Sequence, residues 1–125
     1  MMLGLLLLAA IAACGSKPAS PIELTGTSNA PQQALAVGQQ LKITLDSNPS
    51  TGYRWAVDGA VPPQLQQVAE ASYDGTANMP GAGGTEVWTF VGKSAGTGAL
   101  KLKYWRSFEP TATPVRTFKV SVDVR

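Results

Sequence analysis

Apolar and polar residues alternate in short runs along most of the chain. The clearest run extends from Leu41 to Asp46, where every second side chain is apolar, and this two-residue period is that of a half-buried β-strand. The same alternation recurs at 53–58, 85–91, 100–105 and 117–124, and a less regular run covers Leu65–Tyr73. Clusters of glycine, proline, serine and asparagine separate the runs, as turns do. None of the runs has the period of an amphipathic helix.

Short strands at this spacing predict an all-β fold, an immunoglobulin-like antiparallel β-sandwich of about seven strands. Each run has one apolar face, as antiparallel sheets packed on a common core require. Trp55, Trp88 and Phe90 fall on these apolar faces, and we expect all three to fill the core. Trp105 lies instead on the polar face of its strand, where an indole is either a binding anchor or an apolar contact beneath a loop.

The N-terminal segment 1–13 is apolar and carries no charge. It is too short to cross a membrane as a helix and has the character of a signal-peptide core, although no Lys or Arg precedes it. It ends in Ala12-Ala13 before Cys14, the single cysteine, and so resembles the lipobox of bacterial lipoproteins. A plain secretory peptide with an incidental cysteine is the alternative.

The lipobox resemblance implies cleavage before Cys14 and a lipid on that cysteine, which would anchor the protein to a membrane. The protein would then lie in the cell envelope, at the outer membrane or facing the periplasm if the cell is Gram-negative. Residues 14–21 are polar and contain two prolines, which indicates a tether. The folded domain is therefore expected to span 22–125.

Composition excludes several classes of function. The chain has no histidine and only one cysteine. It therefore cannot form a Ser-His-Asp or Cys-His catalytic site, a common zinc site or an intrachain disulfide. The acidic residues fall on different predicted strands and turns and suggest no carboxylate pair. Ten basic residues against eight acidic ones, without runs, give no reason to expect nucleic acid as a partner. We expect a monomeric binding protein that is not an enzyme and uses no cofactor or metal.

Three loop segments carry the candidate binding chemistry. Their residues are Asn48, Pro49, Ser50, Thr51, Gly52 and Tyr53 in the first, Gly81, Ala82, Gly83 and Gly84 in the second, and Arg106, Ser107 and Phe108 in the third. In the first, proline and glycine favour a rigid turn that loses little entropy on binding. The second offers backbone amides and carbonyls, and the third a guanidinium and an aromatic ring. Taken singly, the first segment could also be a hairpin connection, the second a flexible span, and Arg106 in the third a surface charge.

Together the three segments resemble the chagasin family. Asn48–Trp55 is similar to its Asn-Pro-(Ser/Thr)-Thr-Gly signature, which is followed by an aromatic residue and a tryptophan. Gly81–Phe90 is similar to its Gly-x-Gly-Gly loop and Trp-x-Phe strand, and Tyr104–Glu109 lies where the family has Tyr-x-Arg-Pro-Trp. Ser107 and Phe108 stand in place of that proline and tryptophan, which leaves the third loop more flexible and its aromatic contact smaller.

The resemblance implies a reversible protein inhibitor of papain-like cysteine peptidases, which blocks the active-site cleft with three loops at one end of the sandwich. The middle loop, Asn48–Tyr53, would approach the catalytic cysteine, and the loops at Gly81–Gly84 and Arg106–Phe108 would grip the two sides. A non-inhibitory adhesion or assembly module of the cell envelope, built on the same sandwich, is the alternative, because a fold alone does not set function.

Overall fold

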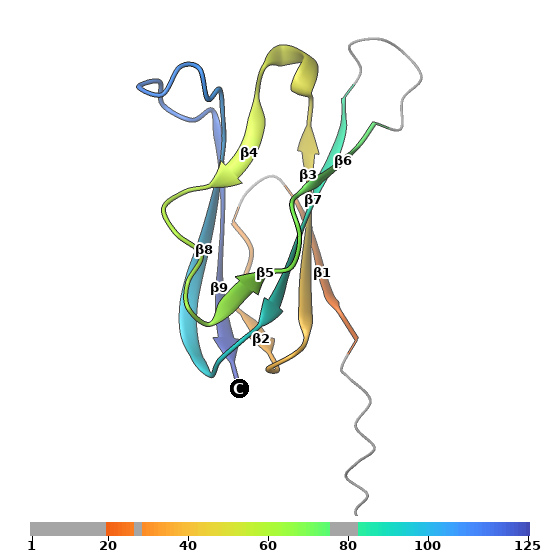
Figure 1. Ribbon diagram of the computed structural model, residues 1–125, viewed down its shortest axis with the longest axis vertical. Helices are drawn as coiled ribbons and strands as arrows, with labels where there is room; N and C mark the ends of the chain where they lie inside the picture. The colour runs from red at the N-terminus through yellow and green to blue at the C-terminus, as the bar shows by residue number, and fades with distance from the viewer. Residues whose placement is uncertain (1–19, 27–28, 76–82) are drawn as a thin grey trace, which may run out of the picture.

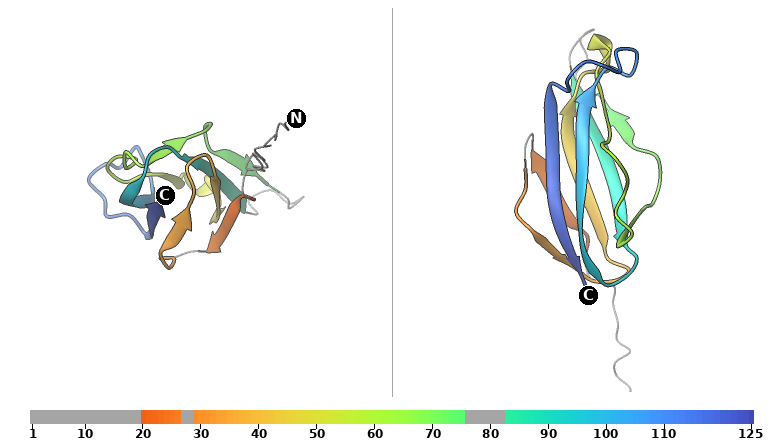
Figure 2. Two further views of the ribbon diagram at one scale, coloured as in Figure 1. Left: turned by 90° about the horizontal axis from the view of Figure 1, so that it is seen from below. Right: turned by 90° about the vertical axis from the view of Figure 1, so that its left-hand side faces the viewer.

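The computed structural model describes residues 20–26, 29–75 and 83–125, which form two β-sheets packed face to face. Figures 1 and 2 show the two layers, with the strands running along the long axis of the molecule. The predicted all-β sandwich is confirmed, and the described residues contain strands and one 3-10 turn. The segment 1–13, Cys14 and most of the predicted tether lie outside the described residues, so the signal segment, the lipid and the tether stay predictions. No helix able to span a membrane occurs among the residues that are described.

The two sheets divide the strands as follows. One, which we call the β3–β7 sheet, has the order β1 (Ile22–Gly26), β3 (Gln40–Ser47), β7 (Gly84–Gly92) and β5 (Leu65–Gln67), with β6 (Ser72–Asp74) also paired to β7. The other, the β8–β9 sheet, has the order β2 (Gln33–Leu35), β9 (Arg116–Val124), β8 (Gly96–Trp105) and β4 (Arg54–Val57). The chain passes from the first sheet to the second between β3 and β4, through the predicted central loop.

The sheets are mixed, although the interior pairs are antiparallel as expected. β1 pairs with β3 in parallel, and β2 pairs with β9 in parallel, each at an edge. A parallel pair needs a crossover in place of a tight turn. Here β2, which lies in the opposite sheet, is part of the crossover between β1 and β3.

The irregular run Leu65–Tyr73 forms two short strands where the sequence indicated one. Both β5 and β6 pair with β7, with Gln67 opposite Phe90 and Ser72 opposite Val87. The four residues 68–71 therefore face only two residues of β7, and this excess interrupts the ladder as a bulge does. The interruption accounts for the poor alternation of this stretch.

The core lies between the sheets and consists of the inward rows of the alternating strands. Trp55, Trp88 and Phe90 are buried, as predicted, with exposed fractions of 4%, 6% and 0%. They pack with the other buried apolar side chains: Leu35, Leu41, Ile43, Leu45, Leu65, Leu100, Leu102, Tyr104, Phe118, Val120, Val122 and Val124. The period-2 pattern identified most of these residues because each strand has only one buried face. Leu35 was missed, because it lies on the three-residue strand β2, which is too short to show an alternation.

Strand register brings the candidate loops to one end of the sandwich. Ser47 lies opposite Gly84 in the β3–β7 sheet, and Arg54 lies opposite Trp105 in the β8–β9 sheet. The connections that follow Ser47, precede Gly84 and follow Trp105 therefore leave the strands at the same end, which is the upper end in Figure 1. The chain enters the domain at the opposite end, where Gln39 Nε2 donates a hydrogen bond of 2.7 Å to the carbonyl oxygen of Ser20.

Candidate functional site

The central loop is a single 3-10 turn, Pro49–Thr51, held by its own side chains. Asn48 caps the turn, and its Oδ1 accepts hydrogen bonds from the backbone N–H of Ser50 at 3.2 Å and from Ser50 Oγ at 2.6 Å. Thr51 Oγ1 donates to the Asn48 carbonyl at 2.7 Å. Pro49 at the first helical position needs no N–H partner, so the sequence closes the turn locally. Both hydroxyls donate within the loop and stiffen it.

Gly52 ends the turn in a left-handed conformation, with φ of 86°. Its N–H donates to the Pro49 carbonyl at 2.9 Å. A Cβ at this position would also lie 3.0 Å from Cζ of Phe108. Glycine is therefore required twice, once for the backbone angle and once for the approach of the third segment.

The third segment braces the central loop through Arg106. The guanidinium donates two hydrogen bonds to the Thr51 carbonyl, from Nε at 3.1 Å and from Nη2 at 3.0 Å. Its Cζ lies 4.4 Å from the centroid of the Tyr53 ring, within cation–π range. Nη1 lies 3.4 Å from Oε1 of Glu109. The sequence predicted Arg106 as an anchor for a partner, and in the structure it spans two of the three predicted loops.

Ser107 and Phe108 occupy the tip of a tight turn that follows Arg106. The N–H of Glu109 donates to the Arg106 carbonyl at 3.0 Å and closes this turn. Phe108 is 67% exposed at the loop end of the molecule. An exposed aromatic side chain on a braced turn is suited to contact a partner. The backbone hydrogen bond and the Arg106–Glu109 ion pair supply part of the restraint that a proline at 107 would add.

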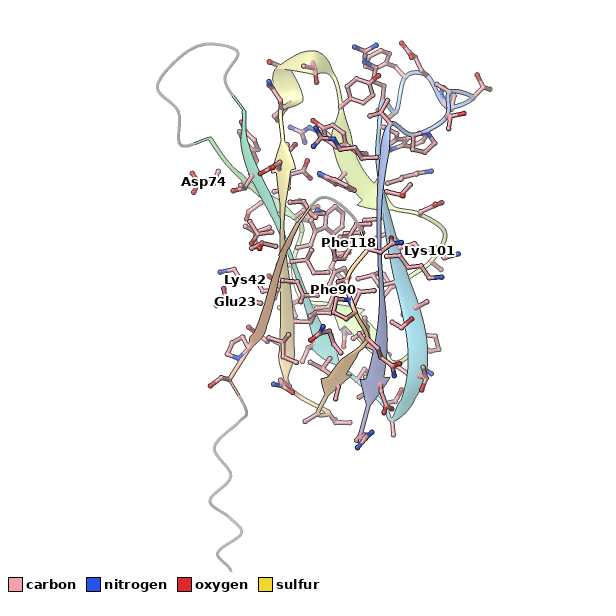
Figure 3. All side chains as sticks on the ribbon, turned by 180° about the vertical axis from the view of Figure 1, so that it is seen from behind. Glu23, Lys42, Asp74, Phe90, Lys101 and Phe118 are labelled. Carbon is pink, nitrogen blue, oxygen red and sulfur yellow. The ribbon has the colours of Figure 1, made fainter. Side chains whose placement is uncertain are left out.

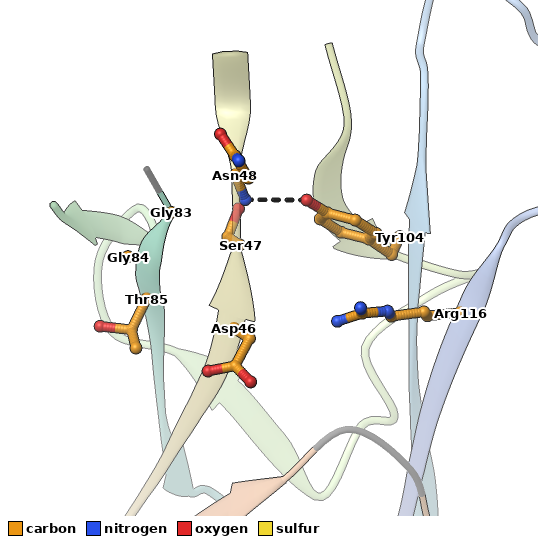
Figure 4. A pocket seen from close by; sticks show the side chains of 8 residues that line it. All are labelled: Asp46, Ser47, Asn48, Gly83, Gly84, Thr85, Tyr104 and Arg116. Carbon is orange, nitrogen blue, oxygen red and sulfur yellow. Dashed lines mark hydrogen bonds between the residues drawn. The ribbon is translucent and has the colours of Figure 1, made fainter. Parts of the chain in front are cut away.

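Tyr104 supports the central loop from below, a role that the sequence did not indicate. Its hydroxyl accepts a hydrogen bond of 2.8 Å from the N–H of Asn48, drawn in Figure 4. Its ring lies 5.4 Å from that of Tyr53 and 5.1 Å from that of Trp55. The start of the loop is thus bound to the tyrosine hydroxyl, and its end is stacked on the tyrosine ring.

Glu86 is a buried carboxylate at the base of the loop, with an exposed fraction of 6%. Its Oε2 accepts hydrogen bonds from Ser47 Oγ at 2.6 Å and from the N–H of Trp55 at 3.1 Å. Ser47 ends β3 and Trp55 belongs to β4, so one oxygen joins the two stems of the loop across the two sheets. Glu86 shares the inward row of its strand with Trp88 and Phe90, and this period could have identified it as buried.

The second segment is only partly described. Gly81 and Ala82 lie outside the described residues, and Gly83 and Gly84 lie where the segment joins β7. A Cβ on Gly83 would lie 3.1 Å from the Ser47 carbonyl oxygen, and one on Gly84 would clash with the carbonyl oxygen of Asp74. These two glycines therefore let the backbones of β3, β6 and β7 approach closely beside the central loop.

A hollow of about 430 Å³ lies beneath the central loop, on the side shown in Figure 4. It is lined by Asp46, Ser47, Asn48, Gly83, Gly84, Thr85, Tyr104 and Arg116. The guanidinium of Arg116 lies 5.6 Å from the Tyr104 ring. Within 20–26, 29–75 and 83–125, no three His, Cys, Asp or Glu side chains gather closely enough to hold a metal ion.

Known proteins resemble this chain in both sequence and fold. Residues 34–122 match the chagasin family of peptidase inhibitors, I42. Chagasin of Trypanosoma cruzi is 35% identical to the chain over 88 residues, which are 67% of this chain and 80% of chagasin.

Two solved structures have the same architecture. The crystal structure of the cysteine protease inhibitor EhICP2 from Entamoeba histolytica has a TM-score of 0.71 at 24% identity, covering 85% of this chain and 96% of that one. PbICP-C, solved in complex with falcipain-2, has a TM-score of 0.56 at 21% identity, covering 83% of this chain and 99% of that one. At these identities the two structures support the fold.

The match over 34–122 covers all of the described candidate site, and the chain covers most of chagasin. The family is made up of peptidase inhibitors, which agrees with the prediction from composition that the protein is not an enzyme. Sequence, fold and comparisons therefore agree: this chain belongs to the chagasin family of cysteine peptidase inhibitors.

Proposed function

We propose that the protein inhibits papain-like cysteine peptidases reversibly, by inserting the loop end of the sandwich into the active-site cleft. The central loop Asn48–Tyr53 enters the cleft, and the segments at Gly81–Gly84 and Arg106–Phe108 contact its two walls. The observation that carries the proposal is the bracing of the central loop from three sides, by Arg106, Tyr104 and Glu86. Chagasin-family membership supplies the class of target.

Inhibition then depends on occlusion and on preorganisation, and no covalent bond is made or broken. Ordering a flexible side chain at an interface costs about 0.5–1.5 kcal/mol. Ser50 and Thr51 in this loop, and Arg106 in the third segment, are already held by hydrogen bonds, so little of that cost arises on binding. The closed turn also keeps the peptide bonds of Pro49–Thr51 out of an extended conformation. The loop can therefore occupy a cleft without being cleaved.

Inhibition of papain and of a cathepsin-type peptidase by the purified protein tests this proposal. We expect a dissociation constant below micromolar with both enzymes, and recovery of the intact inhibitor after incubation. Absence of inhibition at micromolar concentration would favour the alternative, an adhesion or assembly module. Cleavage between Asn48 and Tyr53 during the assay would mean that the protein is a substrate.

We also propose that the protein is a bacterial lipoprotein, anchored through Cys14 in the cell envelope. The chain enters the domain beside Gln39, whereas the central loop begins at the far end of β3. The eight residues of β3 extend about 26 Å at ~3.3 Å per residue. A lipid at Cys14 would thus hold the inhibitory end pointing away from the membrane. Cys14→Ser should release the protein into the soluble fraction, and unchanged membrane association would contradict the proposal.

A further inference from the structure

Charged side chains divide unequally between the two sheets. The strands of the β3–β7 sheet carry four acidic residues and one basic residue, Glu23, Asp46, Asp74, Glu86 and Lys42. The strands of the β8–β9 sheet carry five basic residues and one acidic residue, Arg54, Lys101, Lys103, Arg116, Lys119 and Asp123. Figure 3 shows Lys101 on the opposite side of the core from Glu23 and Asp74. The fold thus separates charges that are mixed along the sequence.

Four of these cations share the outer surface of the β8–β9 sheet, and we call Arg54, Lys101, Lys103 and Lys119 the basic face. Their strand neighbours, such as Trp55, Leu102 and Phe118, point into the core, so alternation directs the four side chains outward. Arg54, Lys101 and Lys119 are exposed, and Lys103 is half-buried.

The positive charge of the basic face is not neutralised within the described part of the chain. None of its four residues has an ion-pair partner there, since the pairs that form involve Lys42, Arg106 and Arg125. Lys101 and Lys119 lie directly opposite each other on β8 and β9, and like charges in this position repel. An anionic partner would relieve this repulsion.

The basic face adjoins the loop end of the molecule. Arg54 directly follows the central loop, and its cross-strand neighbour Trp105 directly precedes Arg106. Lys103 Nζ lies 3.8 Å from the centroid of the Trp105 ring, so an amphipathic indole and its cation stand beside the third segment. A protein seated on the loops would therefore have one edge next to this surface.

We propose that the basic face recognises and steers a peptidase whose surface beside the cleft is acidic. The inference rests on the proposed inhibitory function and adds the electrostatic character of the target. Complementary charge outside the contact accelerates association by a factor of about 10–1,000 and is screened by salt. The basic face acts mainly on the association rate constant, whereas the loops determine how slowly the complex dissociates.

Stopped-flow association kinetics with two papain-like peptidases test the proposal, one of net negative and one of net positive charge at the assay pH. The basic-face variant is Lys101→Gln/Lys103→Gln/Lys119→Gln. The matched control, Lys42→Gln/Lys93→Gln/Arg125→Gln, removes the same charge from the β3–β7 sheet and from the end of the domain opposite the loops. At low salt we expect the basic-face variant to associate with the acidic peptidase about tenfold more slowly than the wild type, with the difference lost at high salt. The control should change by less than twofold.

The proposal would be overturned if the basic-face variant associated with the acidic peptidase as fast as the wild type. It would also be overturned if both variants were slowed equally, because the effect would then reflect net charge alone. A basic-face variant that loses binding to vesicles containing phosphatidylglycerol, or to single-stranded DNA, while its association with the acidic peptidase is unchanged, would assign the surface to another partner. If the wild type inhibits neither peptidase, the proposed function fails and this inference fails with it. If the wild type inhibits the acidic peptidase but its association rate constant does not depend on salt, this inference fails and the proposed function stands.

Discussion

Gly52 allows the role of the central loop to be separated from ordinary stability. Gly52→Ala places a side chain on a residue with φ of 86°, and a non-glycine residue in the left-handed region costs about 1–2 kcal/mol. Gly59 has φ of 92°, but a Cβ there would meet nothing within 4 Å. Gly59→Ala is therefore a matched control that carries the same backbone strain without the contact.

Both substitutions should lower stability by a similar amount. For a domain of this size, 1 kcal/mol corresponds to about 4–8 °C in melting temperature, so we expect a decrease of roughly 4–16 °C in each variant. Thermal unfolding followed by tryptophan fluorescence measures this decrease. The two variants should also bind a peptidase differently, because only the Cβ on Gly52 would lie 3.0 Å and 3.1 Å from ring atoms of Phe108.

The displaced ring and the strained turn change the surface that enters the cleft. A loss of about 1.4 kcal/mol of binding free energy corresponds to a tenfold weaker inhibition constant. We expect at least this loss for Gly52→Ala and less than a twofold change for Gly59→Ala, measured below the melting temperature of both. If Gly52→Ala inhibits as well as the wild type, or if the two variants lose inhibition equally, this turn does not form the inhibitory surface.

Three further substitutions test the supports of the loop. Arg106→Lys keeps the charge but cannot donate from two nitrogens to the Thr51 carbonyl, so the inhibition constant should rise about five- to tenfold with little change in melting temperature; equal inhibition would contradict the brace. Glu86→Ala leaves the Ser47 hydroxyl and the Trp55 N–H without their acceptor, so the free energy of unfolding, measured with urea, should fall by about 2–4 kcal/mol. The control Glu70→Ala changes an exposed residue and should lower it by less than ~0.5 kcal/mol. Phe108→Trp enlarges the exposed ring and should tighten inhibition by a few fold; unchanged inhibition would indicate that this ring does not contact the peptidase.

Local pattern predicted the strands and core because both depend on short-range periodicity. Trp55, Trp88 and Phe90 could be assigned to the core from the alternation along their strands alone. The parallel pairing of β1 with β3 and of β2 with β9 could not be predicted, because the paired strands are not neighbours in the sequence and the alternation within β1 and β2 is short. The interruption of the ladder at 68–71 depends likewise on pairing with β7.

The candidate loops were identified from their residues, but their supports were not. Asn48, Pro49 and Gly52 close a turn through neighbouring backbone, so the turn can be expected from their order alone. The contacts of Arg106 with Thr51 and of Glu86 with Ser47 and Trp55 span tens of residues along the chain. Such contacts exist only after the two sheets have packed.

By itself, the sequence determined the all-β architecture, most of the core, the absence of histidine chemistry and the three motifs that resemble the family. These features are periodic or local, so they can be read along the chain. Only the tertiary structure decided that Arg106 braces the central loop and that Glu86 joins its stems across the sheets. It also gathered Arg54, Lys101, Lys103 and Lys119 on one surface of a protein whose net charge is only +2. Strand pairing sets this arrangement, because it brings residues distant in sequence to the same face of a sheet.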